Sequence, residues 1–419
     1  MKLINQTAVV LAVFAAPAAA QYGSSAPPQP TTRPPAAQQA APAAAATPSV
    51  KPSSKALKAI VDLQTAVNKN DTANIPAKVA AAQAVASTKE DRYLIAQFQL
   101  KVAANANDAA AASTAIDGIA ASGILDASHV AALYRGLGGT YFKAKQFPQA
   151  AAAFQHAIDL DPRDADTLMA LAESQNGVGQ KAQAVATFER AIQTSVAAGQ
   201  KPEEAIYRRA LSIAYEAKLS NSVELGQEWL AAYPGPDSWH NSLAIFRNVD
   251  HPDASATFDL LRLSRATNSM VGDGDYYNYA SEAANQANYG EARAVIAEGI
   301  AAGKIKPTDA GISDVQAALK GKPSPTPAEL AAAEKGASIP NAYIRVGDRY
   351  YGAGNYQKAA ELYRTGVTKG ADPNLGNLRL GEALARAGDK AGATAALSKV
   401  GGSLGPIAKF WTIYAQHQA

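Results

Sequence analysis

The sequence predicts an all-α protein built from a row of short helices, and three observations support this prediction. Hydrophobic residues make up 47% of the 419 residues but aromatic residues only 7%, and much of the apolar content is alanine. This composition favours closely packed helices over a β-sheet. From Ser53 onward, apolar residues recur at three- and four-residue spacing, which places them on one face of a helix. Sustained two-residue alternation of β-branched residues, which is typical of strands, is absent from this stretch.

The N-terminus has the features of a secretory signal peptide over residues 1–20. Lys2 precedes an apolar run at 8–16, and three alanines at 18–20 offer a cleavage site of the A-x-A kind. The apolar run is too short to span a bilayer, and Pro17 would interrupt a continuing helix. We therefore expect an exported protein, periplasmic or alternatively extracellular, with no transmembrane helix after cleavage.

Residues 21–52 are predicted to form a disordered linker rich in Pro and Ala. The segment also contains many Gln, Ser and Thr residues. Closely spaced prolines remove backbone donors and bias the chain toward extended polyproline II. Such a linker could hold the folded part away from a membrane or cell wall, or merely keep the N-terminus in solution.

Two tandem pairs of segments repeat the same order of residues at a spacing of 34. The first pair is Leu137, Gly138, Tyr141, Ala150, Phe154 and Pro162, then Leu171, Ala172, Gln175, Ala184 and Phe188. The second pair is Val346, Gly347, Tyr350, Ala359 and Tyr363, then Leu380, Gly381, Leu384, Ala393 and Leu397. This order closely resembles the pattern W-x2-L-G-x2-Y…A-x3-F…P of the tetratricopeptide-repeat (TPR) family.

The resemblance implies a right-handed superhelical solenoid of TPR-like helix hairpins. In such a hairpin, small residues such as Gly138 and Ala150 let the two helices approach closely. Large residues such as Tyr141 and Phe154 fill the space between one pair and the next. A single pair cannot bury its apolar face, so stability comes from stacking on neighbouring pairs.

The domain organisation is predicted from the positions of the weaker repeats and of a proline-rich break. The additional helix pairs are expected near 56–86, 93–119, 207–233, 239–261 and 276–296. Residues 304–327 contain several prolines and are predicted to be an irregular interruption. The sequence therefore predicts an N-terminal array at 53–303 and a C-terminal array at 328–419.

Composition excludes several classes of function. A net charge of +3, with 18% charged residues, does not favour binding to nucleic acid. The absence of cysteine excludes disulfides, zinc–thiolate sites and cysteine nucleophiles. The histidines are scattered without ligand spacing, and Asp273 and Asp275 lack the later ligands of a calcium loop. We expect neither a metal site nor a cofactor.

Two short motifs of hydrolytic enzymes occur without the context that the chemistry needs. Gly401 to Gly405 match G-x-S-x-G around Ser403, but a nucleophile elbow requires a strand before it and an acid after it. Glu173-Ser174 resembles the Glu-Ser pair of lytic transglycosylases, but it lies inside a predicted repeat helix. The sequence therefore predicts a protein that is not an enzyme.

The TPR resemblance implies that the first helix of each pair lines a concave face, where a peptide segment or helix of another protein binds. The residues expected to be exposed in this groove are Arg135, Phe142, Met169, Glu173, Arg208, Tyr215, Tyr277, Ile344, Tyr351, Leu378 and Arg386. Tyr and Arg are favoured in binding hot spots because they combine a large contact area with hydrogen bonding.

The predicted function is that of a non-catalytic scaffold or adaptor in the cell envelope, which binds a protein partner through this groove. The alternative is an accessory subunit of polysaccharide or cell-wall assembly that binds glycan or a synthesis or export enzyme. Three tyrosines, Tyr276, Tyr277 and Tyr279, motivate the alternative because aromatic rings are suited to glycan binding.

Overall fold

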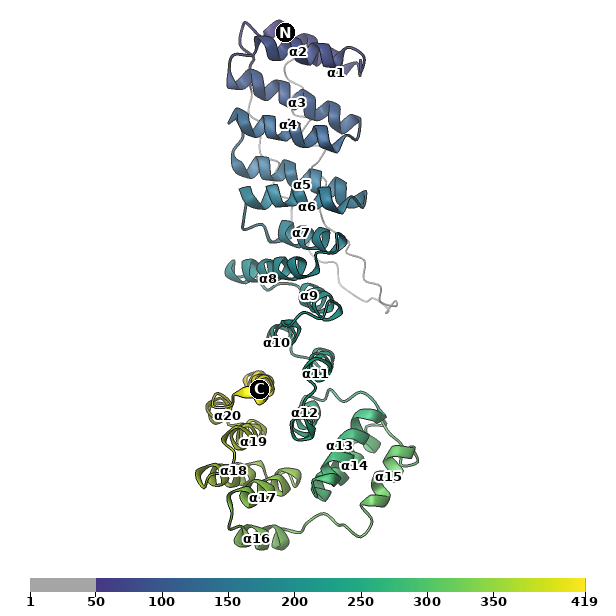
Figure 1. Ribbon diagram of the computed structural model, residues 1–419, viewed down its shortest axis with the longest axis vertical. Helices are drawn as coiled ribbons and strands as arrows, with labels where there is room; N and C mark the ends of the chain where they lie inside the picture. The colour runs from purple at the N-terminus through teal and green to yellow at the C-terminus, as the bar shows by residue number, and fades with distance from the viewer. Residues whose placement is uncertain (1–49, 419) are drawn as a thin grey trace. The chain divides into compact units, whose positions relative to one another are not determined.

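The computed structural model describes residues 50–418, and every regular element within them is a helix (Figure 1). The chain divides into two compact units at Pro202 and Glu203. The predicted all-α fold of tandem helix hairpins is confirmed. The predicted signal peptide, and the part of the predicted linker at 21–49, lie outside the described residues.

The N-terminal unit consists of four consecutive helix pairs in its described part, 50–202. Its helices are α1 (Leu57–Asn68), α2 (Ile75–Val85), α3 (Lys89–Asn105), α4 (Ala109–Ser122), α5 (Ala127–Lys143), α6 (Phe147–Leu160), α7 (Ala165–Gly177) and α8 (Lys181–Ala197). Each pair packs on the next, so the buried faces of these helices form one continuous core.

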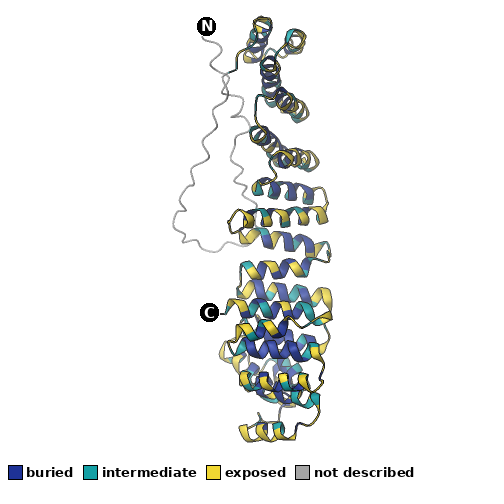
Figure 2. Cartoon of the chain, turned by 90° about the vertical axis from the view of Figure 1, so that its left-hand side faces the viewer, coloured by how far each residue is buried: buried dark blue, intermediate teal, exposed yellow. Residues whose placement is uncertain are grey.

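The C-terminal unit contains the remaining helices. They are α9 (Glu204–Glu216), α10 (Ser222–Ala232), α11 (Pro236–Asp250), α12 (Ala254–Ala266), α13 (Asp273–Asn285), α14 (Tyr289–Ala301), α15 (Ala310–Ala318), α16 (Pro327–Gly336), α17 (Pro340–Gly352), α18 (Tyr356–Thr368), α19 (Pro373–Arg386), α20 (Lys390–Leu397) and α21 (Gly405–His417), the last preceded by a short 3₁₀ turn, η3 (Gly402–Leu404). Within each unit, the helices turn a buried face toward their neighbours and an exposed face outward (Figure 2).

The predicted repeat units coincide with helix hairpins. Helices α5 and α6 form the first predicted unit, and α7 and α8 form its counterpart 34 residues later. The C-terminal tandem pair is α17 with α18 and α19 with α20. The weaker predicted pairs in the middle of the chain are likewise helical hairpins, such as α9 with α10 and α13 with α14.

Small residues stand where the two helices of a hairpin cross, as the repeat pattern predicts. A Cβ atom on Gly138 would lie 2.7 Å from the ring of Phe154, and one on Gly347 would lie 2.7 Å from the ring of Tyr363. At the equivalent Gly381 it would lie 2.4 Å from Cγ of Leu397. These distances are shorter than carbon atoms tolerate, so each glycine is required by the close approach of the large residue opposite.

We expect the substitution Gly138→Ala to lower the free energy of unfolding by about 1–3 kcal/mol, because the new methyl group overpacks the contact with Phe154. The neighbouring Gly139→Ala is the matched control. A Cβ atom on Gly139 meets no atom within 4 Å, and alanine favours a helix by about 0.5–1 kcal/mol over glycine. Urea denaturation of both variants checks the prediction, and equal stabilities would contradict it.

Hydrogen bonds to Asp91 of α3 hold Ser53, which precedes the first described helix pair. The carboxylate of Asp91 accepts hydrogen bonds from the backbone N–H and the hydroxyl of Ser53, both at 2.8 Å, and from the N–H groups of Ser87 and Thr88. Burial alone would raise the pKa of Asp91, but the hydrogen bonds from Ser87 and Ser53 lower it to about 2. The carboxylate therefore stays ionised while it caps α3 and holds residue 53 in place.

The C-terminal unit joins helices that the sequence analysis had assigned to two arrays. The boundary between the compact units falls at 202/203 and not within 304–327. Segment 304–327 also contains α15, whose Ile312 and Val315 are buried in the core around α13. Helix α14, before this segment, packs against α17, after it, and so the helices on both sides belong to one unit.

The C-terminal helix α21 packs back on the beginning of its own unit. The ring of Phe410 lies 5.8 Å from that of Phe246 and 6.4 Å from that of Trp239, both on α11. The side-chain amide of Gln227, on α10, donates to the carbonyl of Pro406 at 3.2 Å. The last helix of the unit thus covers α10 and α11.

Candidate functional site

Four of the predicted groove residues lie on α5 and α7, the first helices of neighbouring pairs in the N-terminal unit. We call Arg135, Phe142, Met169 and Glu173 the N-terminal first-helix face. Arg135 is exposed, and the other three side chains are half-buried. Gly139 lies on the same side of α5, and the space beside its Cα is open. All four residues therefore keep surface that a partner would contact.

The two helices of this face are joined by an ion pair at the start of α7. Nη1 of Arg135 lies 2.5 Å from Oδ2 of Asp164, whose other oxygen caps α7 by accepting from the N–H of Thr167. Burial raises the pKa of Asp164, but the hydrogen bonds from Thr167 and the charge of Arg135 bring it below its usual value. Arg135 remains 46% exposed along its side chain, so it still presents charge to solvent.

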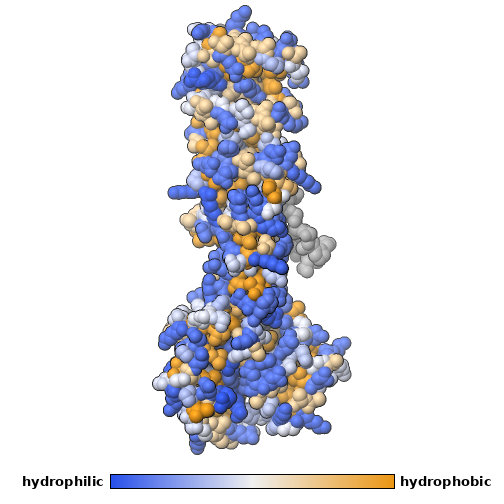
Figure 3. All heavy atoms as spheres, in the orientation of Figure 1, coloured by the Kyte–Doolittle hydropathy of each residue, from blue (hydrophilic) through white to orange (hydrophobic). Residues whose placement is uncertain are grey.

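The apolar members of the face rest on the core beneath them. The ring of Phe142 packs edge-on against that of Phe147 at 5.5 Å, and Met169 packs against the same N-terminal core. In the view of Figure 3, hydrophilic atoms interrupt the hydrophobic ones along α1 to α8. The face thus combines half-buried apolar groups with an exposed cation, which is typical of a modest protein-binding surface.

Three predicted groove residues of the C-terminal unit are buried, so the expectation that they are exposed is wrong. Ile344 is 5% exposed, Tyr351 4% and Leu378 0%. Ile344 packs against Gly366 of the next helix, and Tyr351 lies under the guanidinium group of Arg262, 4.2 Å from its ring centroid. Of these three side chains, Tyr351 is thus covered by α12 of the same chain, and Ile344 by the second helix of its own hairpin, α18.

The remaining four predicted residues keep accessible surface but do not form one site. Arg208 is exposed on α9, as is Tyr215, whose hydroxyl accepts from the amide of Asn248 at 3.2 Å. Tyr277 is 40% exposed and packs beside Gly311 of α15. Arg386 is half-buried and donates to the hydroxyl of Tyr356 at 2.8 Å.

The three tyrosines that motivated the glycan-binding alternative differ in their exposure to solvent. Tyr276 is 6% exposed and Tyr279 is 0% exposed, and both belong to the core of α13 to α15. Only Tyr277 of the three presents its ring to solvent. This segment therefore does not form a row of exposed aromatic rings.

A buried group of charges, which the sequence analysis did not identify, joins four helices of the C-terminal unit. We call it the charge cluster; it consists of Asp259 and Arg262 on α12, Glu291 on α14, Asp348 on α17, and Arg379 and Glu382 on α19. Arg262 donates to Glu291 through Nε at 3.0 Å and Nη2 at 2.9 Å, and to Asp348 through Nη1 at 3.1 Å. Arg379 donates to Asp348 at 2.7 Å and to Asp259 at 3.1 Å.

Aromatic side chains complete the surroundings of Arg262. Its guanidinium group lies between the rings of Phe258 and Tyr351, at 4.3 Å and 4.2 Å from their centroids. The hydroxyl of Tyr279 donates to Glu291, and that of Tyr363 donates to Asp348, each at 2.7 Å. Such a network of paired charges and cation–π contacts fixes the relative positions of the helices that carry it.

Two carboxylates of the charge cluster occupy one position of the repeat. Asp348 follows Gly347 and Glu382 follows Gly381, so two acidic residues occupy the same position in repeats 34 residues apart. That position lies on the first helix beside the buried crossing point, where the repeat pattern requires no charge. Glu173 occupies the same position in an N-terminal repeat and is half-buried there, so the repeat position alone does not identify a buried charge.

The hydrolase-like motifs lie in structural contexts unlike those of the enzymes. Ser403 is exposed in η3, between α20 and α21, where a nucleophile elbow would follow a strand. Ser174 is fully buried, and its hydroxyl donates to the carbonyl of Ala170. Neither serine lies in the arrangement that its motif uses for catalysis.

The histidines and the acidic pair at the start of α13 make local contacts. His129 contacts Asp126 at the start of α5, and His156 stacks on Tyr134. Asp275 accepts from the N–H of Val271 at the N-terminus of α13. Within residues 50–418, no three His, Asp or Glu side chains are grouped so as to hold a metal ion. No helix in this range has both the length and the apolarity to cross a membrane.

No family model and no curated protein matches the sequence. A tetratricopeptide repeat protein from Parabacteroides merdae is 13% identical over 70% of this chain and 99% of its own, with a TM-score of 0.26. PilF of Pseudomonas aeruginosa is 13% identical over 63% and 97%, with a TM-score of 0.23. BtubC (BKLC) from P. vanneervenii is 14% identical over 66% and 96%, with a TM-score of 0.26.

The structural similarity to these proteins is low. The repeat architecture is instead evident from the helix hairpins of this chain. Four of them repeat at 34 residues in two tandem pairs, and a small residue stands at each crossing point, such as Gly138 and Gly381. The chain is an all-α protein of tandem helix hairpins, and its repeats resemble those of TPR proteins.

Proposed function

We propose that this protein is a non-catalytic scaffold that binds a segment of another protein through the N-terminal first-helix face. The main support is that the first-helix residues are accessible in the N-terminal unit but buried in the C-terminal unit. Arg135, Phe142, Met169 and Glu173 keep accessible surface on adjacent first helices, whereas the corresponding Ile344, Tyr351 and Leu378 of α17 and α19 are buried. In TPR-like proteins, the first helices are the elements that hold extended segments or helices of partners.

The proposed partner is a short segment with an acidic or hydrogen-bonding group near an apolar side chain. Arg135 offers a cation that remains 46% exposed, and Phe142 and Met169 offer half-buried apolar surface next to it. Arginine and aromatic residues contribute strongly when a partner excludes water from them. Gly139 leaves room between Arg135 and Phe142 for a side chain of the partner.

The double substitution Arg135→Ala and Met169→Ala is expected to reduce partner capture at least about tenfold, which is the effect of losing one hot-spot contact. The measurement is cross-linking in cells, followed by affinity purification and mass spectrometry of the captured proteins. Circular dichroism should show unchanged helicity, because Arg135 is exposed and Met169 is only half-buried.

The matched control is Arg163→Ala, which removes an exposed arginine from the turn between α6 and α7. This variant should capture the same partner as the unchanged protein. Equal capture by the double variant and the control would refute the proposed face. If the double variant and Arg163→Ala both lost the partner, the total charge of the protein, and not the N-terminal first-helix face, would determine binding.

We further propose that the protein acts in the cell envelope after export. The support is the sequence at 1–20, with Lys2, the apolar run and the three alanines at 18–20. Cell fractionation with intact-mass measurement tests this location. A mature protein that begins at Gln21 in the envelope fraction is expected, whereas a full-length protein in the cytoplasmic fraction would contradict the proposal.

A further inference from the structure

The charge cluster contains more buried carboxyl groups than buried guanidinium groups. Arg262 and Arg379 are surrounded by four carboxyl groups, those of Asp259, Glu291, Asp348 and Glu382. The side chains of Arg262, Asp259, Glu291 and Glu382 are all 0% exposed. If all carboxyl groups were ionised, the cluster would carry two surplus negative charges. A buried charge without a compensating partner is strongly unfavourable, so the surplus requires a bound cation or proton.

Glu382 is the least compensated member of the cluster. Neither of its carboxyl oxygens accepts a hydrogen bond from any described residue, and Nη1 of Arg262 is 3.8 Å from Oε2. Glu291, by contrast, receives two hydrogen bonds from Arg262 and one from Tyr279. Asp259 is intermediate, because Arg379 donates to Oδ1 while Oδ2 has no partner among the described residues.

The surroundings of Glu382 favour a proton over a metal ion. No trio of acidic or histidine side chains in the described part of the chain has the geometry of a metal site. The titratable and charged groups around Glu382 are Asp259 and Arg262 from α12, Glu291 from α14, Asp348 and Tyr351 from α17, Tyr363 from α18, and Arg379 and Arg386 from its own helix. The charged residues of α20 and α21, Lys390, Lys409 and His417, are exposed at the surface.

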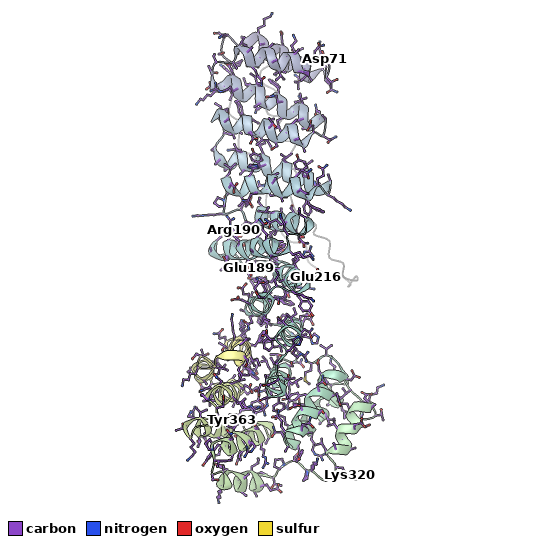
Figure 4. All side chains as sticks on the ribbon, in the orientation of Figure 1. Asp71, Glu189, Arg190, Glu216, Lys320 and Tyr363 are labelled. Carbon is purple, nitrogen blue, oxygen red and sulfur yellow. The ribbon has the colours of Figure 1, made fainter. Side chains whose placement is uncertain are left out.

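We propose that Glu382 binds a proton in the closed C-terminal unit, and that loss of this proton releases α12 from the faces of α17 and α19. The proton removes one of the two surplus charges and converts a carboxylate without donors into a neutral group. Figure 4 labels Tyr363 of α18, whose hydroxyl donates to Asp348 of α17, and Asp348 also pairs with Arg262 of α12. Release would uncover Tyr351, which the guanidinium group of Arg262 now covers. This regulation is independent of the N-terminal first-helix face.

The direction of the pH effect follows from the pKa of Glu382. Burial, followed by the negative charge of Asp259, holds this pKa well above its ordinary value of 4.5. The closed unit therefore binds the proton more tightly than an opened unit, in which the carboxyl group meets water. The stabilisation is fully present below the ordinary pKa and is lost as the pH rises through the pKa of the closed unit. Alkaline conditions thus favour release.

The experiment measures the distance between α12 and α20 as a function of pH in the full-length protein. The natural sequence contains no cysteine, so spin labels on Ala254→Cys of α12 and Ala395→Cys of α20 occupy the only thiols. Both positions are exposed. Between the ordinary pKa of glutamate and the raised pKa of Glu382 in the closed unit, the ratio of long to short distances should rise about tenfold per pH unit, because one proton is released on opening.

Two neutral replacements and one control make the test specific. Glu382→Gln and Glu382→Met should keep the short distance up to the highest pH, since neither side chain has a proton to lose. Glu361→Gln, which removes an exposed carboxylate paired only with Lys358, should behave like the unchanged protein. The proposal is overturned if the distance in the unchanged protein is independent of pH. It is also overturned if both Glu382 variants still open with rising pH or are open throughout, or if Glu361→Gln abolishes the response equally.

Discussion

Replacement of Arg262 by leucine is expected to lower the free energy of unfolding of the C-terminal unit by about 3–5 kcal/mol, the usual effect of breaking a buried ion pair from one side. Arg262 is fully buried and donates to both Glu291 and Asp348. Leucine retains part of the apolar contact with Phe258 and Tyr351, but it removes the cation from Glu291 and leaves Asp348 with Arg379 alone. Tryptophan fluorescence in urea measures the effect, because Trp229, Trp239 and Trp411 are the three tryptophans of the chain and all belong to this unit.

Arg265 provides the matched control on the same helix. It also pairs with a glutamate of α14, Glu298, but that glutamate is 51% exposed. A pair of this kind contributes about 1 kcal/mol or less, because water screens the charges. We therefore expect Arg265→Leu to change stability only slightly. If Arg262→Leu and Arg265→Leu lowered the free energy of unfolding by similar amounts, the buried charge cluster would contribute no more to stability than a partly exposed ion pair.

The hairpins were predictable because their pattern is local. Gly138 and Phe154, or Gly347 and Tyr363, lie within one repeat, and the need for a small residue opposite a large one appears directly in the sequence. Helix α15 was missed because prolines surround it. Its buried Ile312, Val315 and Leu319 nevertheless have helical spacing, and this signal could have identified it.

The burial of the C-terminal face was not predictable from the repeats. Arg262 and Asp348 are 86 residues apart, and Arg379 and Asp259 are 120 apart. A repeat pattern describes how each hairpin packs on its neighbour and contains no information about such distant contacts. Tyr351 and Leu378 were therefore expected on an open groove, although α12 and the rest of the unit cover them. In the N-terminal first-helix face, by contrast, Arg135 is exposed and Phe142, Met169 and Glu173 are half-buried.

The substitution Phe410→Ala is expected to lower the free energy of unfolding of the C-terminal unit by about 3–5 kcal/mol, the usual result of removing a fully buried phenylalanine ring. Phe410 is 0% exposed and contacts Trp239 and Phe246, through which α21 is held on α11. Water then reaches the ring of Trp239, so the tryptophan emission should shift to longer wavelength. Lys409→Ala is the control, because Lys409 is exposed and its nitrogen is 3.9 Å from Glu224; a change within about 0.5 kcal/mol is expected.

The double variant Phe410→Ala, Arg262→Leu tests whether α21 and the charge cluster stabilise the C-terminal unit independently of each other. If α21 and the charge cluster stabilise separate parts, the two losses add, as they do for distant independent sites. We expect a smaller loss than the sum, because both contacts hold the same closed arrangement: α21 on α11, and α12 against α17 and α19. Once the ring of Phe410 is gone, the unit opens more readily, and water reaches Glu291 and Asp348. The loss of Arg262 then leaves carboxylates that are already solvated, so its removal costs less.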